Sequence, residues 1–354
     1  MPLFKDKVVL ITGGTGSLGK VLTRRLLSNQ EDCPRKIIIF SRDEAKQHFM
    51  RVEYQQKQKA TDEIIYHDFE RRVEFRIGDI RNYNSVCAAL DGVDIVINAA
   101  ALKQVPSCEY FPYEAVQTNI GGAENIVQVI KQNHLPVETV VGVSTDKACK
   151  PVNVMGMTKA IQERVFINGN ISSPLTRFVC VRYGNVLASR GSVIPLFHEQ
   201  IKNGGPVTIT TADMTRFLLS LDRAVDTIIA ALENALPGEI FVPRVNAACM
   251  MDVARALIEE RAIDIVITGI RPGEKVHEIL VSHEEAWHTV RRGEYYAIKP
   301  MLPELWQENA SEENLNNEYS SGDSVLDLEQ TRQLLYSHHL NINAELNYDG
   351  EFLR

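Results

Sequence analysis

The chain of 354 residues lacks an excess of basic residues, a long hydrophobic run and a leader-like N-terminus. Its formal net charge of −8 provides no basic surface, so we expect no nucleic acid among its partners. No apolar run approaches the roughly 20 residues that a membrane-spanning helix requires. The first residues contain no apolar core of a signal peptide. These absences predict a cytoplasmic protein without a membrane span.

Closely spaced cysteines are absent as well. The six cysteines are scattered and form no Cys-x-x-Cys pair, so we expect reduced thiols and no metal site. Hydrophobic residues make up 44% of the chain, which is ordinary for a globular protein and excludes wholesale disorder. The length of the chain suggests about two domains.

A glycine-rich turn follows the first apolar run. Residues 8–12 are typical of a buried parallel strand, and the helical pattern of residues 21–27 comes directly after the turn. This order is the context of a dinucleotide site, where glycines let a pyrophosphate approach the backbone at a helix N-terminus; the alternative is a plain glycine loop. The candidate pyrophosphate ligands are Gly13, Thr15, Gly16, Ser17, Leu18 and Gly19.

Apolar runs and helical patterns alternate through the first half of the chain. The predicted strands are residues 8–12, 36–40, 73–77, 94–98, 139–143 and 177–182, and residues 114–132 form an amphipathic helix. This alternation predicts an α/β fold with a Rossmann-type doubly wound parallel sheet. Shorter, mixed segments follow at residues 190–195, 208–217, 239–242 and 271–278, and we expect them to form a smaller mixed α/β substrate-binding lobe.

The change of pattern also sets the expected domain organisation. Residues 1–185 are assigned mainly to a dinucleotide-binding Rossmann domain and residues 186–303 mainly to the substrate-binding lobe. Residues 304–354 are a C-terminal extension, in which the acidic and polar stretch 304–325 is expected to be a long surface excursion.

Ser41 and Arg42 end the second predicted strand, where an NAD enzyme usually has an acidic residue for the ribose hydroxyls. A guanidinium group can grip a phosphate bidentately, so Arg42, with Ser41 and Lys46 beside it, favours the 2′-phosphate of NADP. In the alternative, Asp43 or Glu44 contacts the ribose and Arg42 is merely exposed.

Two further strand ends carry candidate cofactor ligands. An aspartate after the third strand could bind the adenine amino group or cap the next helix, and small residues after the fourth strand let a ribose lie close. Lys103 follows and reaches the cleft or is a solvated loop lysine. The candidates at these strand ends are Asp79, Ile80, Ala99, Ala100 and Ala101.

The stretch from Ser144 to Lys147 joins two hydroxyls, a carboxylate and an ammonium at the end of the fifth predicted strand. Lys159 follows on a predicted helix, one turn from Met155, because residues three and four apart share a helix face. A strand end and a helix start would bring Thr145, Asp146, Lys147 and Lys159 into one cleft. The alternative is a solvated surface turn.

Several blocks resemble the extended short-chain dehydrogenase/reductases and, more narrowly, the soluble UDP-N-acetylglucosamine 4,6-dehydratases of surface-polysaccharide synthesis. They cover about residues 5–300. The blocks are Phe40-Ser-Arg-Asp-Glu44, Ala101-Leu-Lys-Gln-Val-Pro106, Ser144-Thr-Asp-Lys-Ala148, residues 182–195, Met214-Thr-Arg-Phe217 and Arg271-Pro-Gly-Glu-Lys275.

Met155 is the one departure that matters. The wider superfamily has an acid–base tyrosine at this position, and a thioether cannot transfer a proton. The 5-inverting branch of these dehydratases resembles this chain in having methionine there, which favours inversion at C5 of the sugar. The alternative is that Met155 simply packs.

The resemblance implies a redox cycle in which a hydride leaves sugar C4 for NADP⁺ and returns to C6 after water is lost. Lys147 would remove the C5 proton, Asp146 would protonate the leaving C6 hydroxyl and Thr145 would bind O4. Lys159 would hold the nicotinamide ribose. The cycle requires a partly neutral Lys147, which we expect from burial near another cation, and a partly protonated Asp146.

The resemblance also implies ligands for the substrate, UDP-N-acetylglucosamine. Two arginines would clamp the diphosphate, with an asparagine contributing, and a glutamate would bind the uridine ribose; each arginine is structural instead if it is buried beside an acidic partner. The substrate-binding candidates are Lys103, Met155, Asn185, Val193, Arg216, Arg271 and Glu274. The alternatives to a dehydratase are a UDP-sugar 4-epimerase and a non-catalytic NADP-binding sensor or scaffold. We also expect a homo-oligomer.

Overall fold

The structure, a computed structural model, describes residues 2–60, 69–187, 193–306 and 313–342. At its centre is a nine-stranded sheet in the order β14-β15-β10-β6-β5-β4-β1-β2-β3. Neighbours run parallel from β10 to β3, and β15 and β14 join antiparallel at one edge. The strands are β1 (Val8–Thr12), β2 (Lys36–Ser41), β3 (Val73–Ile77), β4 (Ile95–Asn98), β5 (Thr139–Thr145), β6 (Arg177–Tyr183), β10 (Ile240–Pro243), β14 (Thr289–Arg292) and β15 (Tyr295–Ile298).

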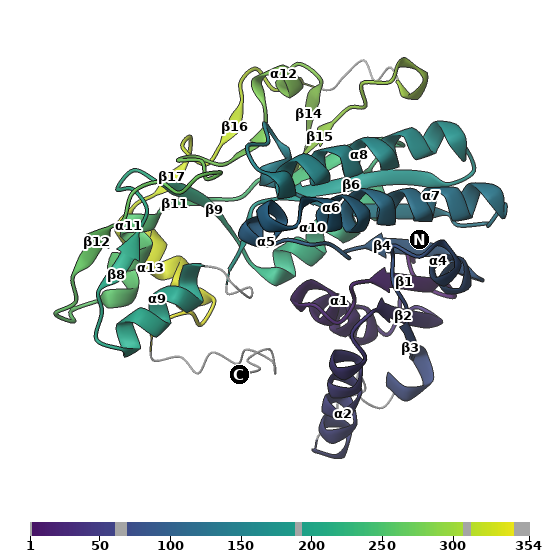
Figure 1. Cartoon of the computed structure of the whole chain (residues 1–354), viewed down its shortest axis with the longest axis horizontal. Helices are drawn as coiled ribbons and strands as arrows, with labels where there is room; N and C mark the ends of the chain where they lie inside the picture. Colours follow the sequence, from purple (N-terminus) through teal and green to yellow (C-terminus); the bar gives the residue numbers. More distant parts are fainter. Residues whose placement is uncertain (1, 61–68, 188–192, 307–312, 343–354) are drawn as a thin grey trace.

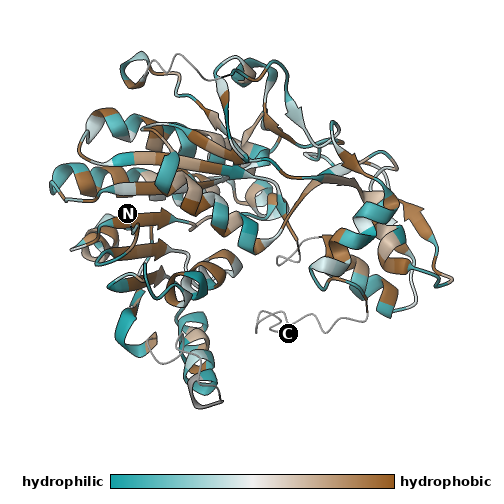
Figure 2. Ribbon diagram, turned by 180° about the vertical axis from the view of Figure 1, so that it is seen from behind, coloured by the Kyte–Doolittle hydropathy of each residue, from teal (hydrophilic) through white to brown (hydrophobic). Residues whose placement is uncertain are grey.

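Helices cover both faces of this sheet, because successive strand residues point to opposite faces and both sets are apolar. In β1, Val9 and Ile11 belong to one core and Leu10 to the other. Figure 2 shows the strands of the sheet as mostly hydrophobic. The first core is covered by α1 (Ser17–Ser28), α2 (Glu44–Ala60) and α10 (Leu221–Asn234), the second by α4 (Tyr83–Leu90), α7 (Gly122–Gln132) and α8 (Val154–Ser172). The predicted α/β doubly wound fold is confirmed.

A second lobe lies beside the sheet, at the left of Figure 1. Its four-stranded sheet has the order β17-β11-β9-β7 and its helices enclose a core of their own. The elements are β7 (Asn185–Val186), α9 (Val193–Lys202), β8 (Val207–Ile209), β9 (Thr215–Leu219), β11 (Ala247–Cys249), α11 (Met250–Ile258), β12 (Ile265–Ile267), β17 (Val325–Leu326) and α13 (Leu328–Ser337). A further pair, β13 (Ile279–Val281) and β16 (Tyr319–Ser320), adjoins this region.

Two expectations about this half of the chain are wrong. Of residues 239–242, the last three belong to β10 of the large sheet, where β10 pairs with β6 and β15. Ile240, Phe241 and Val242 are fully buried between the helical layers of that sheet. The stretch 304–325 is not a surface excursion throughout, since β16 and β17 are paired within sheets and Tyr319 packs on Phe217. Residues 307–312 of that stretch lie outside the described residues.

The helix expected at residues 114–132 is divided. A short helix, α6 (Pro112–Ala115), leads into a π-helical turn at Val116–Gly121 before α7 begins. Within the described ranges, the helices are all too short or too polar to pass through a membrane.

Candidate active site

Thr145, Asp146 and Lys147 lie together at the carboxyl end of β5. Asp146–Ala148 form a single 3-10 turn between this strand and α8. The Thr145 hydroxyl donates to Asp146 Oδ1 at 2.8 Å, and Lys147 Nζ donates to the same oxygen at 3.0 Å. Asp146 is fully buried, whereas the side chain of Lys147 is 24% exposed. The carboxylate therefore reaches a bound molecule through the hydroxyl or the ammonium.

The second lobe adds three side chains to this turn. Glu278 Oε1 lies 3.5 Å from Lys147 Nζ, and Asn185 Oδ1 accepts from the same ammonium at 3.3 Å. Arg216 Nε lies 3.9 Å from Glu278 Oε1. Asn185 begins β7 and Arg216 lies in β9, and the parallel pairing of these two strands brings both residues to the turn. Two carboxylates and two cations thus form one buried cluster.

The electrostatics of the cluster correct one expectation. Burial alone lowers the pKa of Lys147, and Arg216 lowers it further, but the carboxylates of Asp146 and Glu278 outweigh both, so the pKa is raised. The expected partly neutral Lys147 is therefore wrong for the ligand-free site. The reason is that two carboxylates, first Asp146 and then Glu278, act on the ammonium.

One oxygen of each carboxylate in the cluster makes no hydrogen bond with the described residues. Asp146 Oδ2 and Glu278 Oε2 are buried and have no hydrogen-bond partner among the described residues. Burying such an atom without a partner costs free energy, and native structures retain few of them. Unpaired buried carboxylate oxygens beside a lysine are typical of a site that moves protons.

Arg216 meets the criterion for a structural arginine, which is burial beside an acidic partner. It is buried, it donates through Nη1 to the carbonyl oxygens of Thr215 and Val276, and it faces Glu278. Its guanidinium therefore holds β9 against the segment before Glu278, and the diphosphate role stays a prediction. Arg271 is different, because its side chain is 64% exposed and faces only Glu274, at 3.8 Å, among its described neighbours.

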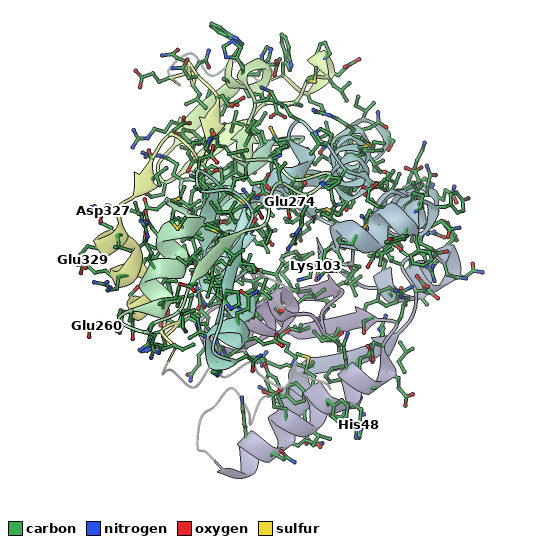
Figure 3. All side chains as sticks on the ribbon, turned by 60° about the vertical axis from the view of Figure 1, so that its left-hand side comes forward. His48, Lys103, Glu260, Glu274, Asp327 and Glu329 are labelled. Carbon is green, nitrogen blue, oxygen red and sulfur yellow. The ribbon has the colours of Figure 1, made fainter. Side chains whose placement is uncertain are left out.

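Two hydrogen bonds join the loop of residues 271–275 to the segment that follows the Asp146–Ala148 turn. Asn153 caps α8 and also donates to the carbonyl oxygen of Gly273 at 2.9 Å, and Lys275 Nζ donates to the carbonyl oxygen of Cys149 at 2.6 Å. In Figure 3, Glu274 and Lys103 lie toward the middle of the view, whereas Glu260, Asp327 and Glu329 lie at the outer edge of the second lobe. Val193 begins α9 in the lobe, and residues 188–192 of the same sequence block lie outside the described residues.

Lys159 and Met155 lie one turn apart at the start of α8, and both are buried. Lys159 Nζ donates to the carbonyl oxygen of Val143 at 2.7 Å and to Gln162 Oε1 at 2.8 Å, and burial lowers its pKa to about 8. Met155 is 4% exposed and packs in an apolar cluster with Cys108. The packing alternative for Met155 therefore agrees with the structure.

A buried ion triad supports the turn from behind. Arg182 is 1% exposed and pairs with Glu163 at 2.7 Å and with Glu285 at 2.8 Å. Glu163 also accepts from the Ser144 hydroxyl at 2.5 Å, next to Thr145. Because both carboxylates are satisfied by one planar guanidinium, the triad fixes the end of β5 against β6 and α8.

The glycine-rich turn has the shape that a pyrophosphate requires. Gly13 has φ +65°, and a Cβ there would lie 2.9 Å from the backbone of Ala100. A Cβ at Gly19 would lie 2.4 Å from the carbonyl oxygen of Gly14, so the helix start packs directly on the turn. No side chain of the described residues caps α1, and its first turn has no acidic residue. Its N-terminal amides suit an anion.

Arg42 directly follows β2 and is half exposed. The Arg42 side chain is 51% exposed and lies 3.7 Å from Asp79. Asp43 accepts from the Lys46 amide and pairs with the Lys46 ammonium at 3.2 Å, and these bonds lower its pKa. Asp43 is thus engaged in capping α2. Asp79 does not cap the helix that follows it, because Asn82 does so.

Asn119 was not identified from the sequence. It lies in the π-helical turn, fully buried, and its amide binds both backbone groups of Leu102, at 2.9 and 3.1 Å, and the Thr158 hydroxyl at 2.9 Å. It therefore fixes Leu102, which directly follows the loop from Ala99 to Ala101 where the cofactor ribose is expected. A π-turn at this point is a recurrent feature of functional sites, but its sequence carries no pattern that predicts it.

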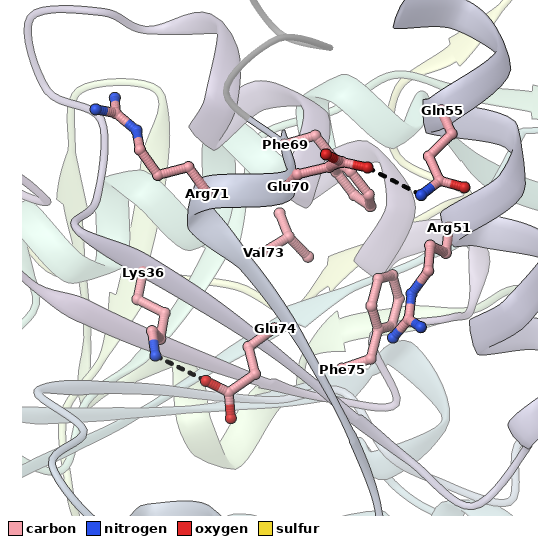
Figure 4. A pocket seen from close by; sticks show the side chains of 9 residues that line it. All are labelled: Lys36, Arg51, Gln55, Phe69, Glu70, Arg71, Val73, Glu74 and Phe75. Atoms are coloured by element: carbon pink, nitrogen blue, oxygen red, sulfur yellow. Dashed lines mark hydrogen bonds and ion pairs between the residues drawn. The ribbon is translucent and has the colours of Figure 1, made fainter.

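A pocket of about 450 Å³ lies away from this cluster, at the β3 edge of the sheet. Figure 4 shows its lining, in which Lys36 pairs with Glu74 at 2.7 Å and Gln55 bonds Glu70 at 2.9 Å. Arg51 lies over the Phe75 ring. Its charged groups are thus paired with one another or stacked, and it contains none of the predicted site residues.

Comparisons with known proteins agree with this architecture. Residues 9–300 match the family described as polysaccharide biosynthesis protein. A protein of Rickettsia typhi named UDP-glucose 4-epimerase is 43% identical over 94% of this chain and 96% of its own length. The structure of Pen from Bacillus thuringiensis is similar with a TM-score of 0.84 and 34% identity, covering 95% of this chain and 99% of that one. The dTDP-glucose 4,6-dehydratase DesIV from Streptomyces venezuelae shares the fold, with a TM-score of 0.63 and 21% identity over 76% of this chain and 86% of that one.

Proposed function

The chain belongs to the polysaccharide biosynthesis protein family, and we propose that it is a nucleotide-sugar enzyme that catalyses the NADP-dependent 4,6-dehydration of UDP-N-acetylglucosamine. The product is a UDP-4-keto-6-deoxy-N-acetylhexosamine. Met155, which the 5-inverting dehydratases share, supports inversion at C5. The family membership supports a role in surface polysaccharide or glycan synthesis.

One observation carries the proposal: Asp146 and Lys147 are in contact at 3.0 Å, and Thr145 donates to the same carboxylate oxygen. Dehydration needs a base for the C5 proton and an acid for the C6 hydroxyl at the same time. Asp146 is the acid once it holds the O4 proton, and Lys147 in its amine form is the base. The Thr145–Asp146 contact also supplies an acceptor for the O4 proton, which compensates for the tyrosine that Met155 replaces.

The bound cofactor supplies reversible hydride transfer, which first converts C4 to a ketone and later reduces C6. The chain's own residues move the protons. Thr145 receives the O4 proton and passes its own to Asp146, which keeps it until the C6 hydroxyl leaves as water. Lys147 takes the C5 proton, which the C4 ketone acidifies, and its ammonium later delivers a proton to C5. In the inverting form the ring turns between the two transfers.

Gly13, Gly16 and the amides at the start of α1 are the proposed pyrophosphate site, and Arg42 with Ser41 and Lys46 the 2′-phosphate site. The engagement of Asp43 in capping α2 supports NADP over NAD, because it removes the nearest acidic candidate for the ribose hydroxyls. The Ala99–Ala101 loop and the Lys159 ammonium remain the proposed nicotinamide ribose contacts.

The exposed Arg271 is the proposed diphosphate ligand, with Lys103 and Asn185 near it and Glu274 on the uridine ribose. Arg216 contributes its positive charge to the proposed diphosphate site and no direct contact, because it is buried against Glu278. We also propose self-association. The outer faces of α8 and of the adjoining segment expose large apolar residues, namely Tyr110, Phe111, Tyr113, Met157 and Ile161.

A UDP-sugar 4-epimerase is the second candidate, and the name carried by the Rickettsia typhi relative favours it. An epimerase removes and replaces only the hydride at C4 and the proton on O4. It has no use for a second acid–base group beside Asp146, and Lys147 is such a group. A cofactor-binding sensor or scaffold would need neither Asp146 nor Lys147 as an acid–base group.

Mass spectrometry of a reaction with UDP-N-acetylglucosamine and NADP⁺ separates the three. Loss of one water from the sugar nucleotide supports the dehydratase. An isomer of unchanged mass, resolved by chromatography, supports the epimerase and overturns the dehydratase. If the cofactor binds but neither UDP-N-acetylglucosamine nor UDP-glucose is converted, the sensor becomes the better reading.

A further inference from the structure

We infer that Glu278 is a positioning residue of the proposed acid–base pair: it holds the Lys147 ammonium beside Asp146 and accepts the Lys147 proton within the site when Lys147 acts as a base. The inference rests on the proposed function for its role in turnover. The contact on which it depends does not, since it is present in the protein without substrate.

The position of Glu278 is fixed from both sides of its backbone. Its amide donates to the Ser321 hydroxyl at 2.9 Å, and its carbonyl accepts from the Ser321 amide at 2.8 Å. Ser321 is fully buried, and its hydroxyl also contacts the Thr215 hydroxyl at 2.7 Å. The backbone of Glu278 is therefore anchored by the segment after β16 and, through Ser321, by β9, independently of Lys147.

Every charged group that faces Lys147 is accounted for in the described chain. Asp146 belongs to its own turn, Glu278 precedes β13 and Arg216 comes from β9; Asn185 is the uncharged neighbour from β7. His277, the residue before Glu278, points to the Thr215 hydroxyl instead, at 2.8 Å. Glu278 is thus one of two groups that keep Lys147 charged.

A charged Lys147 cannot remove a proton from C5, so its own proton must first leave. The 3.5 Å distance between Lys147 Nζ and Glu278 Oε1 is a few tenths of an ångström beyond a hydrogen bond. Oε1, the oxygen that faces the ammonium, receives the proton, and Oε2 is buried with no described hydrogen-bond partner. Transfer breaks one Nζ–H bond and forms one O–H bond, which leaves a neutral amine and a neutral carboxylic acid.

This transfer releases no proton to solvent, and it needs no added acid or base. Lys147 then forms a new Nζ–H bond with the C5 proton while the C5 electron pair enters the enolate. After C5 is reprotonated by Lys147, Glu278 returns its proton to the amine. The chain ends the cycle with the protons with which it began.

The pH dependence of C5 proton exchange tests this role. We expect the wild-type rate, measured with bound UDP-N-acetylglucosamine in deuterated buffer, to be nearly independent of pH around neutrality, because the proton stays inside the cluster. In Glu278→Gln the proton must leave to solvent. The rate should then rise about tenfold per pH unit below the Lys147 pKa, as for any base that must first be deprotonated. Equal slopes in the two proteins would overturn the proton transfer.

A second measurement needs no catalysis. The Lys147 side chain is 24% exposed, so pH-dependent acetylation followed by mass spectrometry reports its pKa. Loss of an opposite charge at this range should lower that pKa by about 1 to 3 pH units in Glu278→Gln. The matched control is Glu284→Gln, which removes a charge from a 74% exposed side chain near Lys150 and should leave Lys147 unchanged.

The outcomes separate this inference from the proposed function. An unchanged Lys147 pKa in Glu278→Gln, or an equal fall in the Glu284 control, overturns the inference even if water is lost from the substrate. A shifted pKa in a protein that never exchanges C5 overturns the proposed function and the proton transfer, and leaves the electrostatic contact supported. If Glu278→Gln does not fold, Glu278→Asp retracts the carboxylate by one methylene, and an unchanged Lys147 pKa in that variant also overturns the inference.

Discussion

Replacing Asp146 by asparagine isolates the first proton transfer of the proposed cycle. Asp146 is fully buried, and its Oδ1 accepts from Thr145 at 2.8 Å and from Lys147 at 3.0 Å. An asparagine carbonyl occupies the same volume and accepts both bonds, so the fold should survive. It cannot take up a proton near neutral pH, so the route from O4 through Thr145 is closed.

The expected size of the effect follows from what a positioned acid–base group contributes, about 10²–10⁴-fold in rate. This corresponds to about 3 to 5 kcal/mol in the activation free energy. The loss should appear in the first half-reaction, the formation of reduced cofactor after rapid mixing with UDP-N-acetylglucosamine. Thr145→Val should show a similar loss because it removes the hydroxyl, whereas Thr145→Ser should retain most of the rate.

Lys147→Ala provides the contrast within the same assay. It leaves the Thr145–Asp146 contact in place, so reduced cofactor should still form, but C5 exchange with deuterated water should stop. Binding of the cofactor should survive in all of these variants, since its proposed contacts lie on other elements. Formation of reduced cofactor at the wild-type rate in Asp146→Asn would refute the route through Thr145, and wild-type C5 exchange in Lys147→Ala would refute the base.

Three further changes test separate parts of the site. Arg42→Ala should weaken NADP binding while NAD binding is kept, because NADP alone has a 2′-phosphate; an equal loss for both in calorimetry argues against this assignment. Met155→Leu should cost less than about 1.5 kcal/mol of stability and keep much of the activity, whereas Met155→Tyr overpacks the apolar cluster and should not raise turnover; a clear gain would mean that a missing hydroxyl limits the enzyme. Gly156→Ala would place a Cβ 2.2 Å from the Lys147 carbonyl oxygen, so we expect a loss of about 1 to 3 kcal/mol in unfolding free energy and of C5 exchange, whereas Gly121→Ala, whose Cβ has its nearest contact at 3.9 Å, is the control; equal melting temperatures for the two would show that the close approach relaxes without cost.

Local patterns predicted the half of the site that the first half of the chain builds. The glycine turn and the strand ends are read from apolar runs of a few residues, because a parallel strand buried on both faces is apolar throughout. The strand at residues 73–77 was predicted with its observed bounds, and β5 was predicted two residues short of Thr145. Thr145, Asp146 and Lys147 are adjacent in sequence, so their proximity required no tertiary information.

The other half depends on pairing between distant segments, which no local pattern encodes. Glu278 is one acidic residue among 46. The bridge between Thr215 of β9 and His277, together with the anchoring by Ser321, brings it to Lys147. For the same reason, the residues of β10 were assigned to the substrate-binding lobe and not to the large sheet. Its apolar residues predicted a strand, but the sheet that a strand joins is decided by the chain between strands.

The contact between Glu278 and Lys147, which no local sequence pattern reveals, also explains why the charge of Lys147 was predicted wrongly. Burial near a cation does lower the pKa of a lysine, and Arg216 is that cation. Two carboxylates, Asp146 and Glu278, oppose that effect and raise the pKa of Lys147. The formal charges of the cluster, two negative and two positive, sum to zero, which makes burial tolerable and lets a proton move inside it without changing the total.

In the proposed reaction the water that leaves takes its hydroxide from C6 and its proton from O4. The C5 proton passes to Lys147, and C5 later receives a proton from Lys147. A neutral, closed cluster is suited to that balance, because no step requires a proton from solvent. A site with a lone lysine base would instead depend on the pH of the surroundings, and the slope of the pH profile in the Glu278 variant distinguishes the two.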